Sequence, residues 1–204
     1  MGTTRPTIAD TPVSGNKNVI YAQFAKQHYP RVLELGPYDG TDTVNLAWYC
    51  DELVSLEARQ ENIDATQARV DAAGLTNVKI IQANLELYDL AQLGKFDAVW
   101  ASGVLYHVPC PWELVEQIGH VTDICYGWTH LAETWGQEKS GYAGREYGEI
   151  DHPLAGLSQM SWWLTPIAFA GTWLNYGFRC EFLTPPDPHP NGGLSAQFVA
   201  RRNG

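Results

Sequence analysis

The sequence predicts a single α/β domain built on a doubly wound, Rossmann-like sheet that is mostly parallel and ends in an antiparallel strand. Two observations carry this prediction. Short apolar segments alternate with segments of helical period through residues 31–131, and such alternation is typical of parallel strands joined by crossover helices. The chain has 204 residues, which suffices for one substantial core and is short for two.

The elements of the first two thirds follow from apolar periodicity and turn residues. Residues 1–13 are polar and predict an arm, whereas apolar residues at helical spacing over 16–28 predict a leading helix. Apolar segments bounded by turn residues predict strands at 31–35, 52–56, 78–81, 96–101 and 124–131. The segments between them predict helices at 41–50, 60–73, 85–93 and 111–119, with Gly74 ending one and Pro111 starting another.

The alternation breaks down over residues 133–162, which are rich in Gly, Trp and Tyr and have no clean period. A long irregular segment in a compact domain is usually a lid or a binding insertion. We therefore expect an arm and leading helix over 1–30 and one domain over 31–204 that contains this insertion. After the insertion, the pattern predicts a helix at 165–176 and strands near 178–183 and 195–201.

Composition narrows the class of protein. The formal net charge is -10 without a relieving Lys/Arg cluster, so a nucleic acid would meet an unfavourable field. The N-terminus lacks an apolar signal segment and no apolar run reaches membrane-spanning length. We therefore expect a soluble, cytoplasmic protein. The widely spaced cysteines suggest buried free thiols rather than disulfides or zinc: Cys50, Cys110, Cys125 and Cys180.

The turn after the first strand is the most informative segment. Gly36 and Gly40 allow a sharp bend and a close approach of the backbone to a ligand. The turn lies at the carboxyl end of the sheet, where such folds bind ligands. It lacks the G-x-G-x-x-G fingerprint of a dinucleotide site, and Glu34 would repel a pyrophosphate. An acidic strand end instead suits a ligand with ammonium and sulfonium groups.

The next two strands end in further polar groups. Glu57 closes the second strand, where a carboxylate can accept hydrogen bonds from both hydroxyls of a ribose. After the third strand, Asn84 offers an amide for adenine and Leu85 an apolar side chain to pack on it. Each residue alone is a weak signal, because a glycine turn is usually only a turn and a glutamate is usually solvated. Their arrangement at three successive strand ends favours a nucleoside site.

Three segments give the sequence a family resemblance: ELGPYDG, SLEAR and KFDAVWASGVLYHVPCPWELV. With them the chain resembles the class I S-adenosylmethionine-dependent methyltransferases over about residues 31–183, and is similar within that class to small members with LELGP and VLYH motifs. The resemblance implies a cofactor site within 31–204 and S-adenosylhomocysteine as the product. Asn84 departs from the aspartate that many members place there, and this departure concerns the geometry of the adenine contact, not the identity of the cofactor. The implied cofactor-binding residues are Glu34, Gly36, Pro37, Tyr38, Gly40, Glu57, Ala58, Asn84, Leu85 and Ser102.

Methyl transfer to a hydroxyl, phenol or acidic carbon needs a base beside the methyl group. His107, shortly after the fourth strand, is the first candidate; its alternative is a structural role bracing the loop before Pro109. His130, at the end of the fifth strand, is the second candidate, with Glu133 close enough in sequence to orient it. His152 belongs to the insertion. No spacing of these residues matches a standard metal cluster, so no metal is expected.

The insertion also supplies the candidate acceptor wall. Trp135, Tyr142 and Tyr147 lie among polar residues and predict an aromatic-walled pocket suited to a sugar ring or a flat organic acceptor, although core packing is the alternative. Trp173, on a predicted helix, is expected in the core. The leading helix near Tyr21 and the insertion would close over the cofactor.

We therefore expect a methyltransferase acting on a small or medium-sized acceptor, with transfer to oxygen favoured over nitrogen or carbon. The partners expected are a small molecule and the cofactor, without nucleic acid or membrane; the sequence specifies no oligomeric state. A non-catalytic sensor of S-adenosylmethionine or S-adenosylhomocysteine, or a partner subunit, is the alternative outside enzymes. A nicotinamide-dependent oxidoreductase is the alternative within enzymes, and the missing glycine fingerprint disfavours it.

Overall fold

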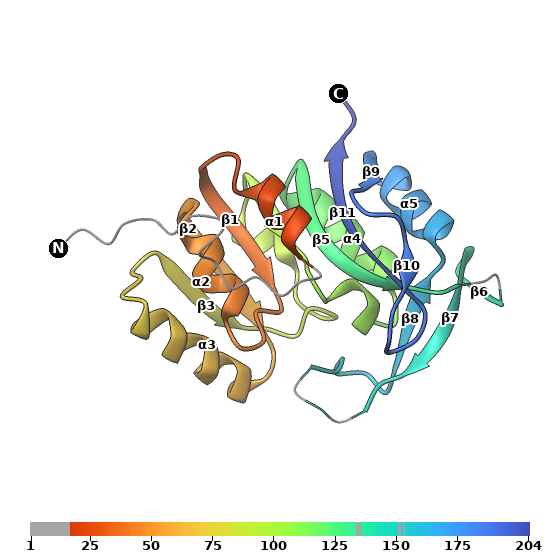
Figure 1. Cartoon of the computed structure of the whole chain (residues 1–204), viewed down its shortest axis with the longest axis horizontal. Helices are drawn as coiled ribbons and strands as arrows, with labels where there is room; N and C mark the ends of the chain where they lie inside the picture. Colours follow the sequence, from red (N-terminus) through yellow and green to blue (C-terminus); the bar gives the residue numbers. More distant parts are fainter. Residues whose placement is uncertain (1–16, 134–135, 151, 153) are drawn as a thin grey trace.

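The computed structural model describes residues 17–133, 136–150, 152 and 154–204 (Figure 1). The arm expected at 1–13 and Trp135 lie outside these residues. The central sheet has eight strands in the order β10-β11-β5-β4-β1-β2-β3, with β9 paired to β11. Its parallel part consists of β1 (Tyr29–Leu35), β2 (Cys50–Glu57), β3 (Val78–Gln82), β4 (Ala98–Trp100) and β5 (Ile124–Leu131). Its antiparallel part consists of β9 (Phe178–Phe182), β10 (Asp187–Pro188) and β11 (Leu194–Arg202).

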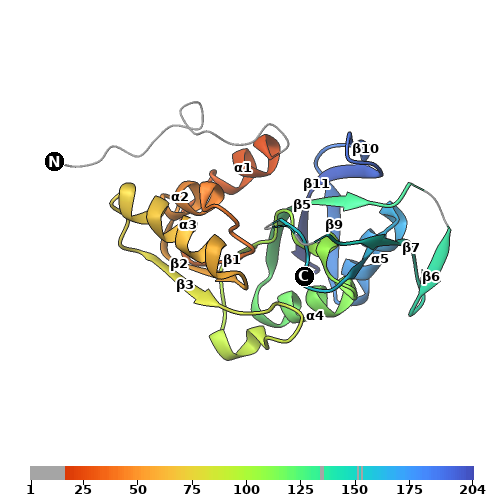
Figure 2. The same ribbon diagram turned by 90° about the horizontal axis from the view of Figure 1, so that it is seen from below.

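This arrangement confirms the predicted fold class. The helices are α1 (Asn18–Phe24), α2 (Thr41–Ala47), α3 (Gln60–Ala72), α4 (Pro111–Val121) and α5 (Pro166–Asn175). Figure 2 shows α1, α2 and α3 on one face of the sheet and α4 on the other. Parallel strands covered on both faces are buried along successive residues rather than at alternating ones, as the last four residues of β1 and the last seven of β5 are.

Two clusters of buried side chains match the two faces of the sheet. Leu33 and Leu35 of β1 pack in the cluster beneath α4 and α5, which also holds Trp173, as expected. Val32 faces the opposite cluster, where α1 packs on the sheet through Phe24. Tyr21 is buried in this second cluster and donates its hydroxyl proton to the carbonyl of Asn45 at 3.0 Å. Tyr21 is therefore a core residue, and the expectation that it closes over the cofactor is wrong.

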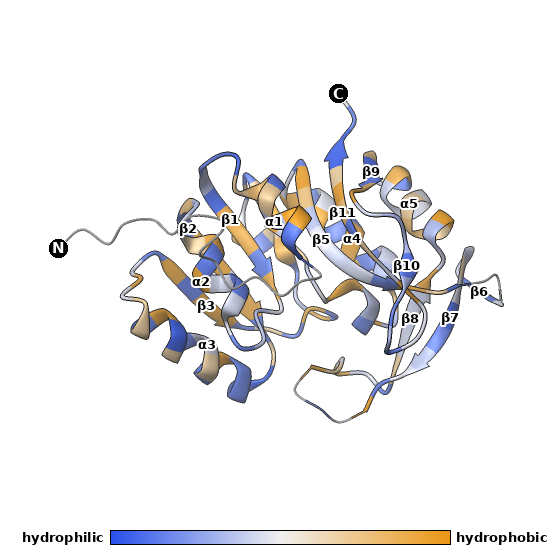
Figure 3. Ribbon diagram, in the orientation of Figure 1, coloured by the Kyte–Doolittle hydropathy of each residue, from blue (hydrophilic) through white to orange (hydrophobic). Residues whose placement is uncertain are grey.

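The insertion differs from the irregular segment expected there. It contains a three-stranded antiparallel sheet of β6 (Gln137–Lys139), β7 (Tyr142–Gly148) and β8 (Met160–Leu164). The sequence did not predict β8 because four successive residues of this strand, 161–164, are all buried. The strand therefore lacks the alternation of apolar and polar residues that identifies a half-buried strand. The described residues of the loop between β7 and β8 form neither helix nor strand and include apolar ones (Figure 3). The helix expected at 85–93 is reduced to a 3₁₀ turn, Leu90–Leu93.

The structure also tests the expectations about the cysteines and about membrane-spanning segments. All four cysteines are free thiols; Cys50 and Cys125 are buried, as expected, whereas Cys110 and Cys180 are partly exposed. Within the described part of the chain, no helix has the length and apolar character needed to cross a membrane.

The close approach of β4 and β5 requires a glycine, which gives a stability prediction. A Cβ on Gly127 would lie 2.5 Å from both the Ala101 carbonyl oxygen and the Phe198 ring. Gly127→Ala should therefore lower the free energy of unfolding by about 2–3 kcal/mol, measured by urea denaturation. Gly171→Ala is the matched control, because a Cβ there meets nothing within 4 Å in the interior of α5. It should raise stability by about 0.5–1 kcal/mol; equal effects of both substitutions would contradict this account.

Candidate active site

A cavity of about 110 Å³ opens at the carboxyl ends of β1, β2, β3 and β4. This edge of a doubly wound sheet is where the loops following successive strands meet. The lining residues come from these strand ends and from the β7–β8 loop: Gly36, Tyr38, Leu56, Glu57, Ala58, Arg59, Asn62, Asn84, Leu85, Glu86, Gly103, Val104, His107, Val108, Leu154, Ala155, Gly156 and Leu157.

The bend after β1 has the backbone geometry that its glycines allow. Gly36 and Gly40 have φ of 66° and 79°, and Tyr38 between them has φ of 55°. A Cβ on Gly36 would lie 2.8 Å from the Val104 side chain, and one on Gly40 would lie 2.8 Å from the Thr66 backbone. Both positions therefore need glycine for conformation and for space. Gly36 and Tyr38 face the cavity, whereas Pro37 and Gly40 are buried behind it and shape the bend.

Glu57, at the end of β2, is held by backbone amides. Its Oε1 accepts hydrogen bonds from the amides of Ala58 at 2.8 Å and Arg59 at 3.0 Å, and its Oε2 accepts one from the Tyr38 amide at 3.3 Å. These bonds fix the carboxylate against the cavity wall. Glu57 thus joins β2 to the bend after β1.

Glu34 lies beneath the bend and does not line the cavity. Its Oε2 accepts hydrogen bonds from Ser55 at 2.6 Å and Thr43 at 2.8 Å, while its buried Oε1 has no hydrogen-bond partner among the described residues. Burial raises the pKa of Glu34 to about 7, against the hydrogen bonds from Ser55 and Thr43. Direct contact between Glu34 and a cofactor remains a prediction.

Asn84 and Leu85 line the cavity after β3. The Asn84 side-chain oxygen accepts a hydrogen bond from the Glu86 amide at 2.9 Å, which fixes the side chain in a tight turn. The Asn84 amide nitrogen is then the group best placed to serve a ligand as a donor. Ser102, after β4, is buried and lies outside the cavity lining, and its hydroxyl has no hydrogen-bond partner among the residues that the structure describes. Ala58 lines the cavity as predicted.

His107 lines the cavity and forms a hydrogen bond that the sequence did not reveal. Its Nδ1 lies 3.1 Å from both carboxylate oxygens of Glu149, whose side chain is 4% exposed. A carboxylate only accepts, so Nδ1 carries the proton and Nε2 is left for a substrate. Burial alone would raise the pKa of Glu149, but its interactions with His107 and Ser161 and the hydrogen bond from the Gly156 amide outweigh burial and lower the pKa.

His130 lies beside His107 but in a different environment. The ring of Tyr106 contacts both imidazoles, with centroids 4.1 Å from His107 and 4.7 Å from His130. Burial, with a smaller contribution from the charge of His189, lowers the pKa of His130 to about 4, so its imidazole is neutral at neutral pH. The expectation that Glu133 orients His130 is wrong, because Glu133 is exposed and the His130 Nδ1 has no partner in the described structure.

An aromatic wall continues from His130 into the insertion. Trp163 stacks between His130 at 4.7 Å and Tyr147 at 4.2 Å, and His189 contacts the His130 ring edge-on at 4.4 Å. Tyr147 therefore belongs to this group of rings, whereas Tyr142 stacks on Trp112 at 4.9 Å as part of core packing. An acceptor pocket walled by Tyr147 stays a prediction. His189 was missed because it lies in a proline-rich connection with no local signal.

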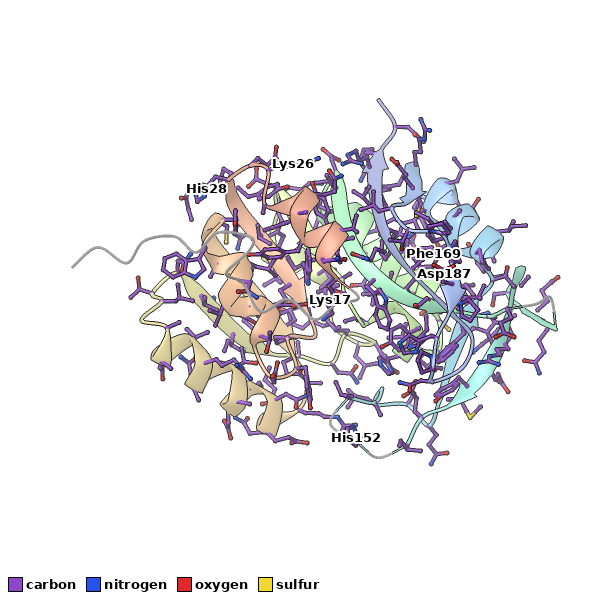
Figure 4. The ribbon with its side chains drawn as sticks, viewed as in Figure 1. Lys17, Lys26, His28, His152, Phe169 and Asp187 are labelled. Atoms are coloured by element: carbon purple, nitrogen blue, oxygen red, sulfur yellow. The ribbon has the colours of Figure 1, made fainter. Side chains whose placement is uncertain are left out.

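The β7–β8 loop reaches over the cavity. Leu154, Ala155, Gly156 and Leu157 contribute to the lining, and His152 lies on the same loop at the outer edge of the molecule (Figure 4). Among the described residues, no group of three or more His, Cys, Asp or Glu side chains is placed to hold a metal ion. The cavity thus combines a carboxylate at β2, an amide at β3, an imidazole after β4 and an apolar cover.

A protein-family model and several solved structures resemble this chain. A model described as a methyltransferase domain matches residues 32–123. The N-terminal domain of EvdMO1 with SAH bound is 30% identical with a TM-score of 0.81, over 90% of this chain and 78% of that chain. The same domain in the presence of SAH and D-fucose is 29% identical with a TM-score of 0.83, over 99% and 85%.

A third solved structure, that of EvdMO1 itself, is 28% identical with a TM-score of 0.72 over 92% of this chain. The match spans 41% of that longer protein. No curated protein sequence matches this chain.

Proposed function

This chain belongs to the class I S-adenosylmethionine-dependent methyltransferases, and we propose that it transfers the methyl group to a hydroxyl oxygen of a small molecule with His107 as the base. S-adenosylmethionine is its cofactor. The observation that carries the proposal is the His107–Glu149 pair at the edge of the cavity, with both Nδ1–carboxylate distances at 3.1 Å. Methyl transfer to an uncharged hydroxyl needs a place for the hydroxyl proton, and this pair offers one.

The lining residues fit the cofactor. The Glu57 carboxylate, fixed by the bend and by the start of α3, would accept hydrogen bonds from the ribose hydroxyls. The Asn84 amide nitrogen would donate to an adenine ring nitrogen, and Leu85 and Val108 would pack on the base. When bound there, the cofactor supplies a methyl group already activated on a sulfonium sulfur. The chain's own task is then to align the acceptor and exclude water.

His107 would accept the proton that the hydroxyl loses as the oxygen–methyl bond forms. Glu149 holds the Nδ1 proton, so Nε2 takes the proton and the carboxylate stabilises the resulting imidazolium. Burial raises the pKa of the Tyr106 phenol well above its ordinary value, which keeps it protonated as a hydrogen-bond donor beside His107. His130 is the weaker candidate because its lowered pKa makes it a poor proton acceptor.

We favour a sugar as the acceptor. Tyr147 and His189 are partly exposed beside the buried Trp163, and partly exposed aromatic rings with polar edges suit the C–H face and hydroxyls of a pyranose. The relative at 29% identity was crystallised in the presence of SAH and D-fucose, which supports the same class of acceptor. A flat phenol is the alternative acceptor for an aromatic wall.

The test is an acceptor panel. Purified enzyme with S-adenosylmethionine is offered hexoses including D-fucose, phenols and primary amines, and formation of S-adenosylhomocysteine is measured. We expect turnover with a sugar and an O-methyl signal in the NMR spectrum of the product. Turnover confined to phenols would overturn the sugar assignment. A methyl group found only on nitrogen or carbon would overturn O-methylation.

A further inference from the structure

The carboxylate that holds His107 also holds the loop that covers the cofactor cavity. We propose that Glu149 is a positioning residue that makes cavity closure and alignment of His107 a single event. Residues 154–158 of the β7–β8 loop are called the strap below. The inference rests on the proposed function for the role of His107, whereas its structural half, the link between His107 and the strap, can be tested without an acceptor.

The strap is attached to two of the strand ends that form the cavity. The Ser158 hydroxyl donates to a carboxylate oxygen of Glu86, after β3, at 2.6 Å. The Arg59 guanidinium, after β2, donates to the Gly156 carbonyl at 3.4 Å. Because Leu154 and Leu157 line the cavity while about half exposed on the outside, the strap forms a thin cover. A nucleoside buried beneath it leaves only after these attachments open.

The third attachment runs through Glu149. Its Oε2 accepts hydrogen bonds from the strap amide of Gly156 at 3.0 Å and from His107 Nδ1 at 3.1 Å. A Cβ on Gly156 would lie 2.1 Å from the His107 carbonyl oxygen, so the strap backbone rests directly on the loop that carries the base. One buried carboxylate therefore bonds the base and the cover at the same time.

The consequence is a coupling between binding and catalysis. When the strap lifts, Glu149 loses the Gly156 amide, and a buried carboxylate left with fewer partners is destabilised where it stands. His107 then loses the partner that fixes its tautomer. With the strap closed over the cofactor, both bonds form together. The base is thus ordered in the loaded enzyme and not in the open one, which is a form of induced fit.

A double-mutant cycle on release of S-adenosylhomocysteine tests the link. The dissociation rate is measured by stopped-flow fluorescence for the wild type, H107A, E149A and the double variant. We expect each single variant to release the product about tenfold faster, the effect of one lost charged hydrogen bond. H107A should add nothing in the E149A background. Equal acceleration by H107A in both backgrounds would mean that His107 holds the cofactor directly, and it would overturn the link.

Two further variants serve as a conservative substitution and as a matched control. E149Q preserves the shape of the side chain and guards against misfolding of E149A; it should fall between wild type and E149A in release rate. E146Q makes the same change on an exposed residue of β7 and should match the wild type. If E149Q equals wild type in release and turnover, the proposal is wrong.

Turnover gives the second readout. E149A should lower kcat at least tenfold while the KM for the acceptor changes less than about threefold, because the base and not the acceptor wall is disturbed. A rise in KM alone would contradict a positioning role. If the acceptor panel gives no turnover, the proposed function fails, yet the release cycle still reports whether His107 and the strap are linked.

Discussion

Glu57→Ala is expected to weaken binding of S-adenosylmethionine at least 100-fold, to below detection by calorimetry, with the circular dichroism spectrum nearly unchanged. Three backbone amides hold the carboxylate in place before any ligand arrives, so little ordering is left to oppose binding. Two charge-assisted hydrogen bonds to a ribose are worth about 1.5–3 kcal/mol each. Their loss, together with three amides left without their acceptor, accounts for the expected factor.

Glu61→Ala is the control for this experiment. Glu61 lies in the first turn of α3, is exposed, and is absent from the cavity lining. Glu61→Ala removes the same charge as Glu57→Ala, four positions further along the chain. It should leave the affinity for S-adenosylmethionine within about twofold, since an exposed charge contributes little. Unaltered affinity in Glu57→Ala would contradict the ribose assignment.

His107→Ala is expected to lower kcat by about 100-fold or more, the range associated with loss of a general base. Cofactor affinity should fall by no more than about tenfold, because His107 acts on the cofactor only through the strap. The measurement is steady-state turnover at saturating cofactor, with affinity taken from calorimetry on the same samples.

His130→Ala and His120→Ala complete this comparison. His130 contacts Tyr106 and Trp163 but lacks a carboxylate partner in the described structure, so its loss should lower kcat less than the loss of His107. His120 lies exposed in the last turn of α4, and its replacement should have no effect on kcat. Full activity in both His107→Ala and His130→Ala would show that neither residue is catalytic.

The parts of the site that could be predicted are local in sequence. The bend between Gly36 and Gly40 follows directly from residues that tolerate positive φ, and Glu57 follows from the end of an apolar strand. Parallel strands bring such ends to one edge of the sheet, so Asn84 and Leu85 could be placed in the same cavity. Glu34 shows the limit of this reasoning, because the side chain of a strand residue two positions before the bend points beneath the cavity.

The parts that could not be predicted depend on contacts between distant segments. Glu149 is 42 positions from His107, and no pattern in the insertion distinguishes it from neighbouring acidic residues. Glu133 is near His130 in sequence, yet it points to solvent. Glu149, directly after β7, instead pairs with the other histidine, His107. Tertiary packing, which periodicity does not report, decides such pairings.

A crystal structure of the chain soaked with S-adenosylhomocysteine tests the central claim most directly. We predict both ribose hydroxyls on the Glu57 carboxylate, the strap closed above the nucleoside, and the thioether sulfur facing an open space bordered by the Nε2 of His107. A nucleoside bound away from Glu57, or a sulfur directed away from His107, would contradict this account of how the chain binds its cofactor and moves the proton.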